Sequence, residues 1–529
     1  MRRRRPAWPR RLRARLLAAA LLVAALALGG CTVPVFAPEA GGRGAVAPSG
    51  QPAPGPSGQL AWRPCPDVPA QLVGRGAPDM SYDCATLKVP QDWSAPSNGQ
   101  TFDLALIRVR SAKQHDRIGS LLVNPGGPGA SGVDLAVYLS FGAAFQGISE
   151  EVTSRFDIVG FDPRGVDRSS PVECIPDAQL DQSFGYVPDP TTQPEFDGLV
   201  DLNRTIGREC QAKYGGKLKL FSTVQTAKDM DAIRAAVGDQ KLTYLGFSYG
   251  TLLGATYAQL FPKNVRALVL DGAVDPRQSF VAGSESQAKG FELAFTNFAK
   301  WCDPNPDQCP IAPDARAAVT SAIEKAEVSP AADRDGRKAT AGWVFYAVVS
   351  SLYTQSGWQA LASAIKSLEE GNPDQVFRLA DSYAERSPDG TYSNLFDANI
   401  AVNCADQKAV PSVDEVRALQ DQWRTSIPLF GGPLAVGMLT CAVWPGGHDP
   451  YPTGPATGSA PILVVGTTGD PATPYAQAPA LASMLGVGRL LTWEGEGHTA
   501  YPQTGCVSNA VDAYLIDLTL PPEGKRCPA

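Results

Sequence analysis

Short apolar runs recur along the chain, and each ends in a turn rich in glycine, proline, aspartate or glutamate. Runs of this length between turn residues are typical of buried strands. They are Gly119–Val123, Phe156–Phe161, Leu242–Phe247, Arg266–Leu270, Pro461–Val465 and Leu490–Trp493. Apolar residues at helical spacing lie in Ser222–Gly238, Thr251–Phe261 and Val507–Leu518. Strands that alternate with helices predict a mostly parallel sheet covered by helices on both faces.

A different pattern occupies residues 281–440, where strand signals become rare and helical segments dominate, as in Trp358–Leu368. We therefore expect a helical cap inserted into the sheet domain. The insertion divides that domain into residues 61–280 and residues 441–529, and the second part ends in a cysteine-rich tail.

The first 30 residues have the features of a signal peptide, because eight arginines precede the apolar run Leu16–Leu28. The run ends in Leu28-Gly29-Gly30-Cys31, which resembles a bacterial lipobox, so we expect a lipid on Cys31 after cleavage. Residues 31–60 are rich in Pro, Gly and Ala and are expected to form a flexible tether. These features predict export and a lipid anchor on the outer face of the bacterial cytoplasmic membrane. Secretion after cleavage elsewhere stays open as the alternative.

Charge and cysteine content narrow the function classes. Removal of the eight N-terminal arginines changes the formal net charge from −7 to −15, which argues against nucleic acid as a partner. The three histidines lie far apart and no Cys/His group has zinc spacing, so we expect neither a metal nor a cofactor. Export permits disulfides, and nearest-neighbour pairing of the remaining cysteines is a hypothesis that sequence cannot establish. These cysteines are Cys65, Cys84, Cys174, Cys210, Cys302, Cys309, Cys404, Cys441, Cys506 and Cys527.

The first chemical signal lies in Lys241–Phe261, where a strand turns through Gly246-Phe247-Ser248-Tyr249-Gly250 into a helix. A G-x-S-x-G turn between a strand and a helix is a nucleophile elbow, which exposes the serine hydroxyl above the sheet edge. The short motif also arises by chance in a chain rich in Gly and Ser, and an ordinary turn serine is the alternative. The flanking strand and helix favour Ser248 as a nucleophile.

A second signal follows the strand Gly119–Val123, which ends in Asn124-Pro125-Gly126-Gly127-Pro128-Gly129. An oxyanion hole needs bare backbone amides that point to the place where negative charge develops. Glycine amides between prolines can lie directly against a ligand. We expect Gly127 to supply one donor and Tyr249, the residue after the nucleophile, to supply the other.

The same segment also matches a dinucleotide-binding fingerprint through Gly127, Gly129 and Gly132. Glu150 lies at about the distance expected of an acid that binds the ribose. Pro128, however, removes one amide that would face the phosphates. A dinucleotide-binding domain would also leave the serine elbow unexplained, so this alternative is disfavoured.

A serine hydroxyl needs a base to accept its proton, and an imidazole oriented by a buried carboxylate is the usual one. Asp470 and His498 each follow a late strand, so the chain order is Ser248, Asp470, His498. This is the order of α/β-hydrolases, in which both partners lie on loops at the carboxyl ends of strands. His448 precedes Asp470 and follows no strand, and His115 lies in a charged turn. We therefore expect Ser248, Asp470 and His498 to form a catalytic triad.

Taken together, five motifs resemble those of the secreted tripeptidyl aminopeptidase family, α/β-hydrolase exopeptidases related to proline iminopeptidases. They are Asn124–Gly129, Asp162-Pro163-Arg164-Gly165, Gly246–Gly250, Asp470-Pro471-x-Thr473-Pro474 and Gly495-x-Gly497-His498. The resemblance implies an α/β-hydrolase fold, the triad above, and a peptide substrate with a free N-terminus. It also implies that a cap carboxylate holds the amine, and Asp406 is the candidate. Thr473 is expected to order the loop of the acid.

We therefore expect a serine aminopeptidase, tripeptidyl or similar, that acts on peptides outside the cytoplasmic membrane. One alternative is a carboxylesterase or lipase with the same triad, and another is an inert cell-surface binding protein on a hydrolase scaffold. The complete set of catalytic side chains argues against the inert scaffold. Between residues 281 and 430 the chain has 20 Asp and Glu against 13 Lys and Arg. This balance weakly favours a peptide amine over an ester as substrate.

Overall fold

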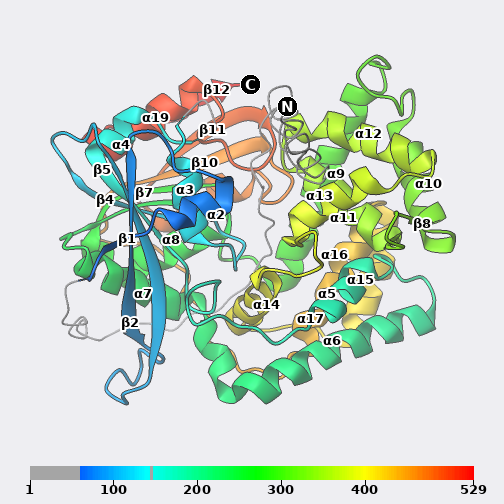
Figure 1. Cartoon of the computed structure of the whole chain (residues 1–529), viewed down its shortest axis with the longest axis horizontal. Coiled ribbons are helices and arrows are strands. Elements are labelled where there is room, and N and C mark those ends of the chain that lie inside the picture. The colour runs from blue at the N-terminus through cyan, green and yellow to red at the C-terminus, as the bar shows by residue number, and fades with distance from the viewer. Residues whose placement is uncertain (1–59, 143–146) are drawn as a thin grey trace, which may run out of the picture. The chain divides into compact units, whose positions relative to one another are not determined.

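The computed structural model describes residues 60–142 and 147–529 (Figure 1). The expected signal peptide, Cys31 and residues 31–59 of the expected tether lie outside these described residues. Within the described part of the chain, no helix has both the length and the apolar character needed to cross a membrane.

The centre of the fold is a sheet with ten described strands in the order β1-β2-β3-β5-β4-β6-β7-β10-β11-β12. From β5 to β12 all neighbours are parallel, and β1, β2 and β3 form an antiparallel edge. The mostly parallel sheet is therefore confirmed. The strands are β1 (Arg63–Pro64), β2 (Met80–Pro90), β3 (Thr101–Ser111), β4 (Gly119–Asn124), β5 (Phe156–Phe161), β6 (Leu242–Phe247), β7 (Val265–Asp271), β10 (Ile462–Gly469), β11 (Gly488–Glu496) and β12 (Arg526–Pro528).

Helices cover both faces of this sheet. Successive strand residues point to opposite sides, and in β4 the residues on both sides are buried. In β4, Leu122 packs in the same core as Leu253 of α8, whereas Leu121 packs with Val137 of α3 and Val511 of α19. The helices beside the sheet are α2 (Asp67–Val73), α3 (Gly132–Leu139), α4 (Glu150–Arg155), α7 (Thr223–Ala236), α8 (Tyr249–Leu260), α18 (Gln477–Leu485) and α19 (Gly505–Asp517). Short 3₁₀ turns lie at Gly215–Phe221, Pro262–Asn264 and Gln355–Gly357.

A separate group of helices, called here the helical layer, gathers beside the sheet in Figure 1. Most of it comes from the segment between β7 and β10, as the change in sequence pattern predicts. Its helices are α9 (Phe280–Cys302), α10 (Ala315–Val328), α11 (Ala341–Leu352), α12 (Trp358–Glu369), α13 (Asp374–Ala384), α14 (Leu395–Asp406), α15 (Val413–Ser426), α16 (Gly431–Gly437) and α17 (Leu439–Ala442). A small hairpin, β8 (Ala331–Ala332) and β9 (Lys338–Ala339), joins α10 to α11.

Two earlier helices, α5 (Asp177–Gly185) and α6 (Gln193–Tyr214), also pack in this layer. They follow β5, in a stretch that the sequence analysis assigned to the sheet domain. Arg386 pairs with Asp181 of α5, and Arg424 pairs with Asp189 in the α5–α6 connection. The helical layer is therefore assembled from two separate stretches of chain.

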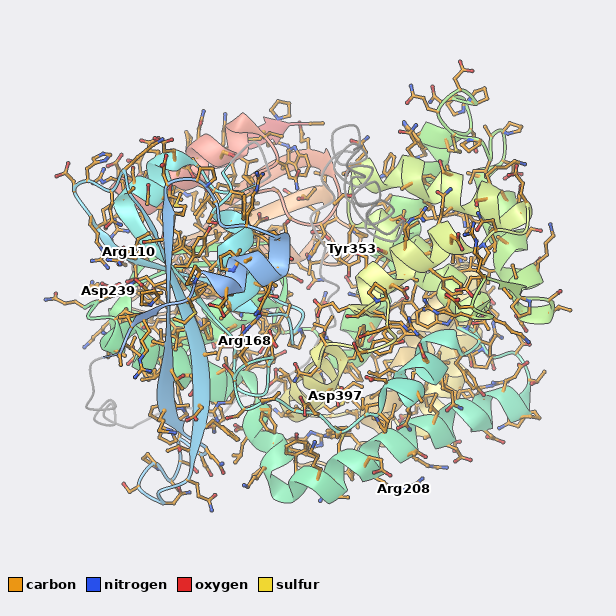
Figure 2. The ribbon with its side chains drawn as sticks, in the orientation of Figure 1. Arg110, Arg168, Arg208, Asp239, Tyr353 and Asp397 are labelled. Carbon is orange, nitrogen blue, oxygen red and sulfur yellow. A yellow bond between two sulfur atoms is a disulfide. The ribbon has the colours of Figure 1, made fainter. Side chains whose placement is uncertain are left out.

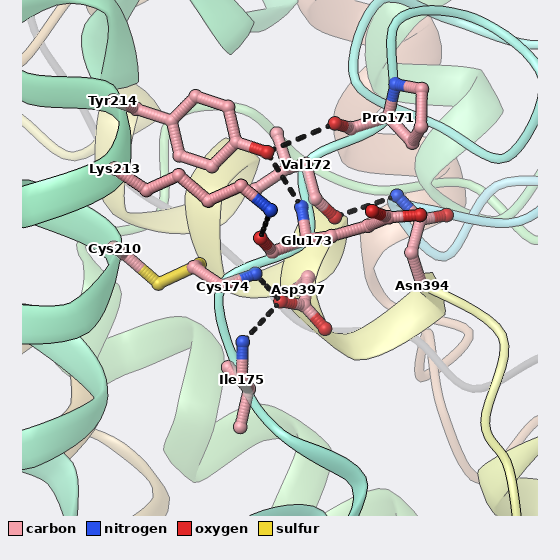
Figure 3. The surroundings of a disulfide bond; sticks show 10 residues. All are labelled: Pro171, Val172, Glu173, Cys174, Ile175, Cys210, Lys213, Tyr214, Asn394 and Asp397. Carbon is pink, nitrogen blue, oxygen red and sulfur yellow. Dashed lines mark hydrogen bonds between the residues drawn. A yellow bond between two sulfur atoms is a disulfide. The ribbon is translucent and has the colours of Figure 1, made fainter.

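The disulfides of the described residues join neighbouring cysteines in the order that the sequence suggested. They are Cys65–Cys84, Cys174–Cys210, Cys302–Cys309, Cys404–Cys441 and Cys506–Cys527. Figure 3 shows the surroundings of the Cys174–Cys210 bridge, where Asp397 of α14 accepts hydrogen bonds from the amides of Cys174 and Ile175 at 2.6 and 2.9 Å. This bridge region ties the first stretch of the layer to the second.

The Asp162-Pro163-Arg164-Gly165 motif has a structural role. Arg164 is fully buried and pairs with Asp229 of α7 at 2.6 Å, while its guanidinium also donates to main-chain carbonyls near the end of β2. Asp162 accepts from the Ser131 hydroxyl at 2.5 Å and from the Val133 amide at 3.1 Å. A buried carboxylate thus holds the start of α3, the helix that follows the glycine-rich loop.

Candidate active site

Ser248 lies between β6 and α8 with φ 56° and ψ −125°. A positive φ is strained for a residue with a side chain, and this strain is characteristic of a nucleophile elbow. The Ser248 amide donates to the Asp271 carbonyl of β7 at 2.8 Å, and the Thr251 hydroxyl donates to the Ser248 carbonyl at 2.7 Å. The neighbouring strand and the first turn of the helix therefore fix the elbow.

The glycine-rich loop lies directly against the elbow. A Cβ atom on Gly126 would lie 2.9 Å from the Ser248 Cβ and 3.0 Å from the Tyr249 amide nitrogen, so only glycine fits there. Gly126 and Gly127 have φ values of 97° and 104°, which disfavour other residues. Tyr249 is the first residue of α8, and the first amides of a helix have no acceptor within it. The two amides predicted for the oxyanion hole thus belong to adjacent segments.

His498 and Asp470 form a buried pair at the carboxyl ends of β11 and β10. The His498 Nδ1 lies 2.9 Å from each carboxylate oxygen of Asp470. Asp470 also accepts from the amides of Ala472 and Thr473 at 2.9 Å and from the Thr473 hydroxyl at 3.0 Å. Thr473 therefore orders the acid loop, as the family resemblance implied. An Nδ1 proton shared with the carboxylate leaves Nε2 with its lone pair available as a base.

The serine and the histidine converge on the end of β7. The Asp271 carbonyl accepts from Ser248, and a Cβ on the next residue, Gly272, would lie 3.0 Å from the His498 Cε1. The Ser248 Oγ and the His498 Nε2 are both buried, and neither has a hydrogen-bond partner among the described residues. Serine–histidine hydrogen bonds are often long in the absence of substrate and tighten when it binds. Nε2 is therefore the imidazole nitrogen that remains available to accept a proton on the side of the elbow.

The helical layer contacts each of the three catalytic loops. The His498 amide donates to the Tyr353 carbonyl at 2.7 Å, and the Tyr353 ring meets the imidazole edge-on with ring centroids 5.4 Å apart. Figure 2 shows Tyr353 between the sheet and the helical layer. Gln287 of α9 donates to the Ala472 carbonyl in the acid loop at 3.2 Å. Asn399 of α14 donates to the Pro128 carbonyl in the glycine-rich loop at 2.9 Å.

Asp406 does not occupy the place that the resemblance implied. It is 3% exposed, and its carboxyl oxygens accept from the Thr223 amide at 2.8 Å and the Thr223 hydroxyl at 2.5 Å. The Thr223 hydroxyl also bonds to the Tyr249 hydroxyl. Burial raises the pKa of Asp406 to about 8, so the carboxyl is mostly neutral at pH 7. This geometry argues against contact with a substrate amine and instead links Asp406 to the side chain of Tyr249.

The remaining histidines lie elsewhere. The His448 Nδ1 lies 2.9 Å from the Cys404 carbonyl, and the His115 Nδ1 lies 3.3 Å from the Lys113 carbonyl in an exposed turn. Glu150, the acid of the disfavoured dinucleotide fingerprint, forms an exposed ion pair with Lys113. Within the described residues, no three His, Cys, Asp or Glu side chains are grouped so that they could hold a metal ion.

A cavity of about 210 Å³, called here the cap cavity, lies inside the helical layer. It is lined by residues of α5, α6, α9, α11, α13, α14, α16 and α17, including Phe184, Phe291, Val349 and Leu434. Its lining residues include neither Ser248 nor His498, but they do include Gln287 and Asn399, which contact the catalytic loops.

Sequence reasoning missed Asp271 and the contacts made by Tyr353, Gln287 and Asn399. The Asp271 carboxylate accepts from the amides of Ala500 and Tyr501 at 3.0 and 2.7 Å, just beyond His498. The one available signal was its place at the end of a buried strand, next to a glycine. The other three lie on helices and a turn whose position over the site depends on tertiary packing.

The fold and the site together define a serine hydrolase of the α/β hydrolase class. The alpha/beta hydrolase fold family matches residues 119–503, and the chain belongs to this family.

Its full-length relatives include two proteins of Mycobacterium tuberculosis. The chain is 39% identical to serine protease Hip1 over 97% of both chains. It is 37% identical to carboxylesterase B over 97% of this chain and 99% of that protein. It is also 30% identical to tripeptidyl aminopeptidase of Streptomyces coelicolor over 82% of this chain and 80% of that protein.

Proposed function

We propose that the protein is a serine peptidase that removes short fragments from the free N-terminus of peptides. The observation that carries the hydrolase chemistry is the buried Asp470–His498 pair beside the Ser248 elbow. Support for peptides as substrates comes from the relatives named serine protease Hip1 and tripeptidyl aminopeptidase.

In the proposed mechanism, the Ser248 Oγ attacks the scissile carbonyl carbon while the His498 Nε2 accepts its proton. Asp470 stabilises the imidazolium that forms. The amides of Gly127 and Tyr249 donate to the oxygen on which negative charge develops. His498 then protonates the leaving amine, and water attacks the acyl-enzyme with His498 again as base.

A substrate with a free N-terminus brings a positive charge, which a carboxylate near the glycine-rich loop would stabilise. In place of Asp406, we propose Glu385 for this contact. Glu385 accepts from the Ser393 hydroxyl, two residues before Leu395, whose carbonyl packs against Gly129. Burial, together with the charge of Asp134, raises the pKa of Glu385 to about 7. A bound ammonium would favour the ionised carboxylate and so gain binding energy at neutral pH.

Paired peptides test the proposal, each prepared with a free amine and with an acetylated N-terminus. We expect cleavage of the free peptides, with short N-terminal fragments identified by mass spectrometry, and little cleavage of the acetylated ones. Ser248→Ala is the control and should lower turnover on the order of 10⁴-fold or more if Ser248 is the nucleophile. Equal cleavage of both peptide forms would contradict the exopeptidase proposal, and full activity of the alanine variant would remove Ser248 from the mechanism.

Ester hydrolysis is the second candidate function. It is favoured by the similarity to carboxylesterase B and by the cap cavity, none of whose lining side chains carries a charge. Turnover of p-nitrophenyl esters without turnover of any free peptide in the same pool would favour this candidate.

The proposal also includes an exported enzyme held at the outer face of the cytoplasmic membrane by a lipid on Cys31. Its support is the basic and apolar N-terminal segment, which ends in the lipobox-like Leu28-Gly29-Gly30-Cys31.

A further inference from the structure

The cap cavity has the lining of a subsite for an apolar group. Aromatic and aliphatic side chains such as Phe184, Phe291, Phe345 and Leu434 form most of its wall, and none of its lining residues is charged. Several lining rings pack against one another: Phe184 meets Phe396 edge-on with ring centroids 4.6 Å apart, and Phe345 meets Tyr346 edge-on at 5.7 Å. A ligand that enters this space exchanges water for a lining that is mostly apolar and also contains uncharged polar side chains such as Asn203 and Thr440.

Three contacts connect the cavity wall to the catalytic loops. Asn399 lines the cavity and donates to the Pro128 carbonyl of the glycine-rich loop. Gln287 lines it and donates to the Ala472 carbonyl beyond Asp470. The third contact is made by Phe291, which lines the cavity and packs edge-on against the Tyr353 ring. Tyr353 in turn packs edge-on against the His498 imidazole. The cavity wall therefore contacts the glycine-rich loop and the acid loop directly, and reaches the histidine through Tyr353.

The volume limits the size of the occupant. An engineered apolar cavity of about 150 Å³ is large enough to bind benzene, whereas pockets for whole drug-sized ligands occupy roughly 300–1,000 Å³. At about 210 Å³, the cap cavity lies between these two sizes and can take one large side chain.

The helices that enclose the cap cavity determine which part of a peptide substrate can enter it. In an aminopeptidase the leaving part of the substrate has no fixed length and must pass out to solvent. The released N-terminal fragment has an end, so only it can be enclosed by helices from two stretches of chain, such as α6 and α14. This step rests on the aminopeptidase function proposed above.

We propose that the cap cavity binds one large apolar or aromatic side chain of the N-terminal fragment, and that it makes the enzyme selective for such fragments. Full burial of a leucine or phenylalanine side chain predicts a preference over alanine of about 10- to 100-fold in kcat/KM. The preference should hold at one position of the released fragment, because the cavity admits a single side chain.

The experiment uses the full chain and a series of peptides with a free N-terminus. In this series each position of the released fragment is occupied in turn by Ala, Leu, Phe, Asp or Lys. A parallel series of p-nitrophenyl esters carries acyl chains from acetate to octanoate. Val349→Phe fills the cavity from α11, and Val328→Phe makes the same substitution at a site that is 88% exposed. We expect the Phe-to-Ala ratio of kcat/KM to fall at least fivefold in the first variant and to stay within twofold in the second.

Failure of this proposal can be distinguished from failure of the aminopeptidase function. Peptides that are cleaved from the free end with no apolar preference at any position of the fragment would overturn the cavity proposal alone. A preference confined to the leaving side would also overturn it. Esters cleaved with a chain-length preference that Val349→Phe abolishes, without peptide cleavage, would support the apolar cavity and refute the aminopeptidase. If Val349→Phe does not fold, Leu434→Ala replaces it and should weaken the same preference by enlarging the cavity.

Discussion

Asp271 is the residue whose substitution tests the geometry of the site most directly. Its carbonyl accepts from the Ser248 amide at 2.8 Å, and its carboxylate accepts from the amides of Ala500 and Tyr501 at 3.0 and 2.7 Å. One buried residue at the end of β7 therefore holds both the nucleophile elbow and the loop that follows His498. If this geometry matters, loss of the carboxylate must affect stability and catalysis together.

The magnitude follows from a comparison of two variants. Asp271→Ala leaves two buried amides without their acceptor, and each such amide costs about 1–3 kcal/mol, or about 2–6 kcal/mol for both. Asp271→Asn keeps a side-chain oxygen that can accept hydrogen bonds from the same two amides. Burial raises the pKa of Asp271 to about 6, so both variants gain roughly 3 kcal/mol at pH 7.5 from loss of the buried charge. The difference between the variants therefore cancels the charge effect and reports the two hydrogen bonds, together with the packing lost when the buried side chain is shortened to alanine.

Urea denaturation followed by circular dichroism measures the free energy of unfolding, and hydrolysis of p-nitrophenyl acetate measures kcat. We expect the alanine variant to be less stable than the asparagine variant by about 2–6 kcal/mol. A displacement of His498 on the order of 1 Å should also lower kcat of the alanine variant by about 10²-fold. The asparagine variant should lose much less activity.

Equal stability of the two variants would show that the amides of Ala500 and Tyr501 do not depend on this carboxylate. A kcat for Asp271→Ala within twofold of that of the parent protein would refute the claim that Asp271 positions the histidine loop.

Two further predictions concern Asp406 and Cys31. Because burial raises the pKa of Asp406 to about 8, the parent protein should lose stability as pH rises from about 4 to 8, at most about 1.4 kcal/mol per pH unit from this group. Asp406→Asn removes this dependence, so its Tm relative to the parent should rise between pH 5 and 8 while KM for free peptides is unchanged; a constant Tm difference or a fivefold higher KM would contradict this. Cys31→Ala should move the protein from the membrane fraction to the soluble fraction of cells that process lipoproteins, and membrane retention would exclude Cys31 as the anchor.

Local pattern predicted the elements that carry the triad because each is specified by its own residues. Leu242–Phe247 is a strand with the predicted bounds, and the predicted helix at Ser222–Gly238 is α7, Thr223–Ala236. Its N-terminal cap is Ser222, whose hydroxyl accepts from the Gln225 amide. A strand, a cap or an elbow depends on a few neighbouring residues, so the sequence contains enough information to predict it.

The sequence alone determined that a serine, an acid and a histidine follow three different strands of one parallel sheet. The carboxyl ends of such strands meet at one edge, so convergence of Ser248, Asp470 and His498 follows from chain order. Only the tertiary structure decided that Asp406 is buried against Thr223 and that α5 and α6 complete the cap cavity. The physical reason is that burial and contact depend on residues more than 150 positions apart, and no periodicity along the chain encodes which distant side chains share a space.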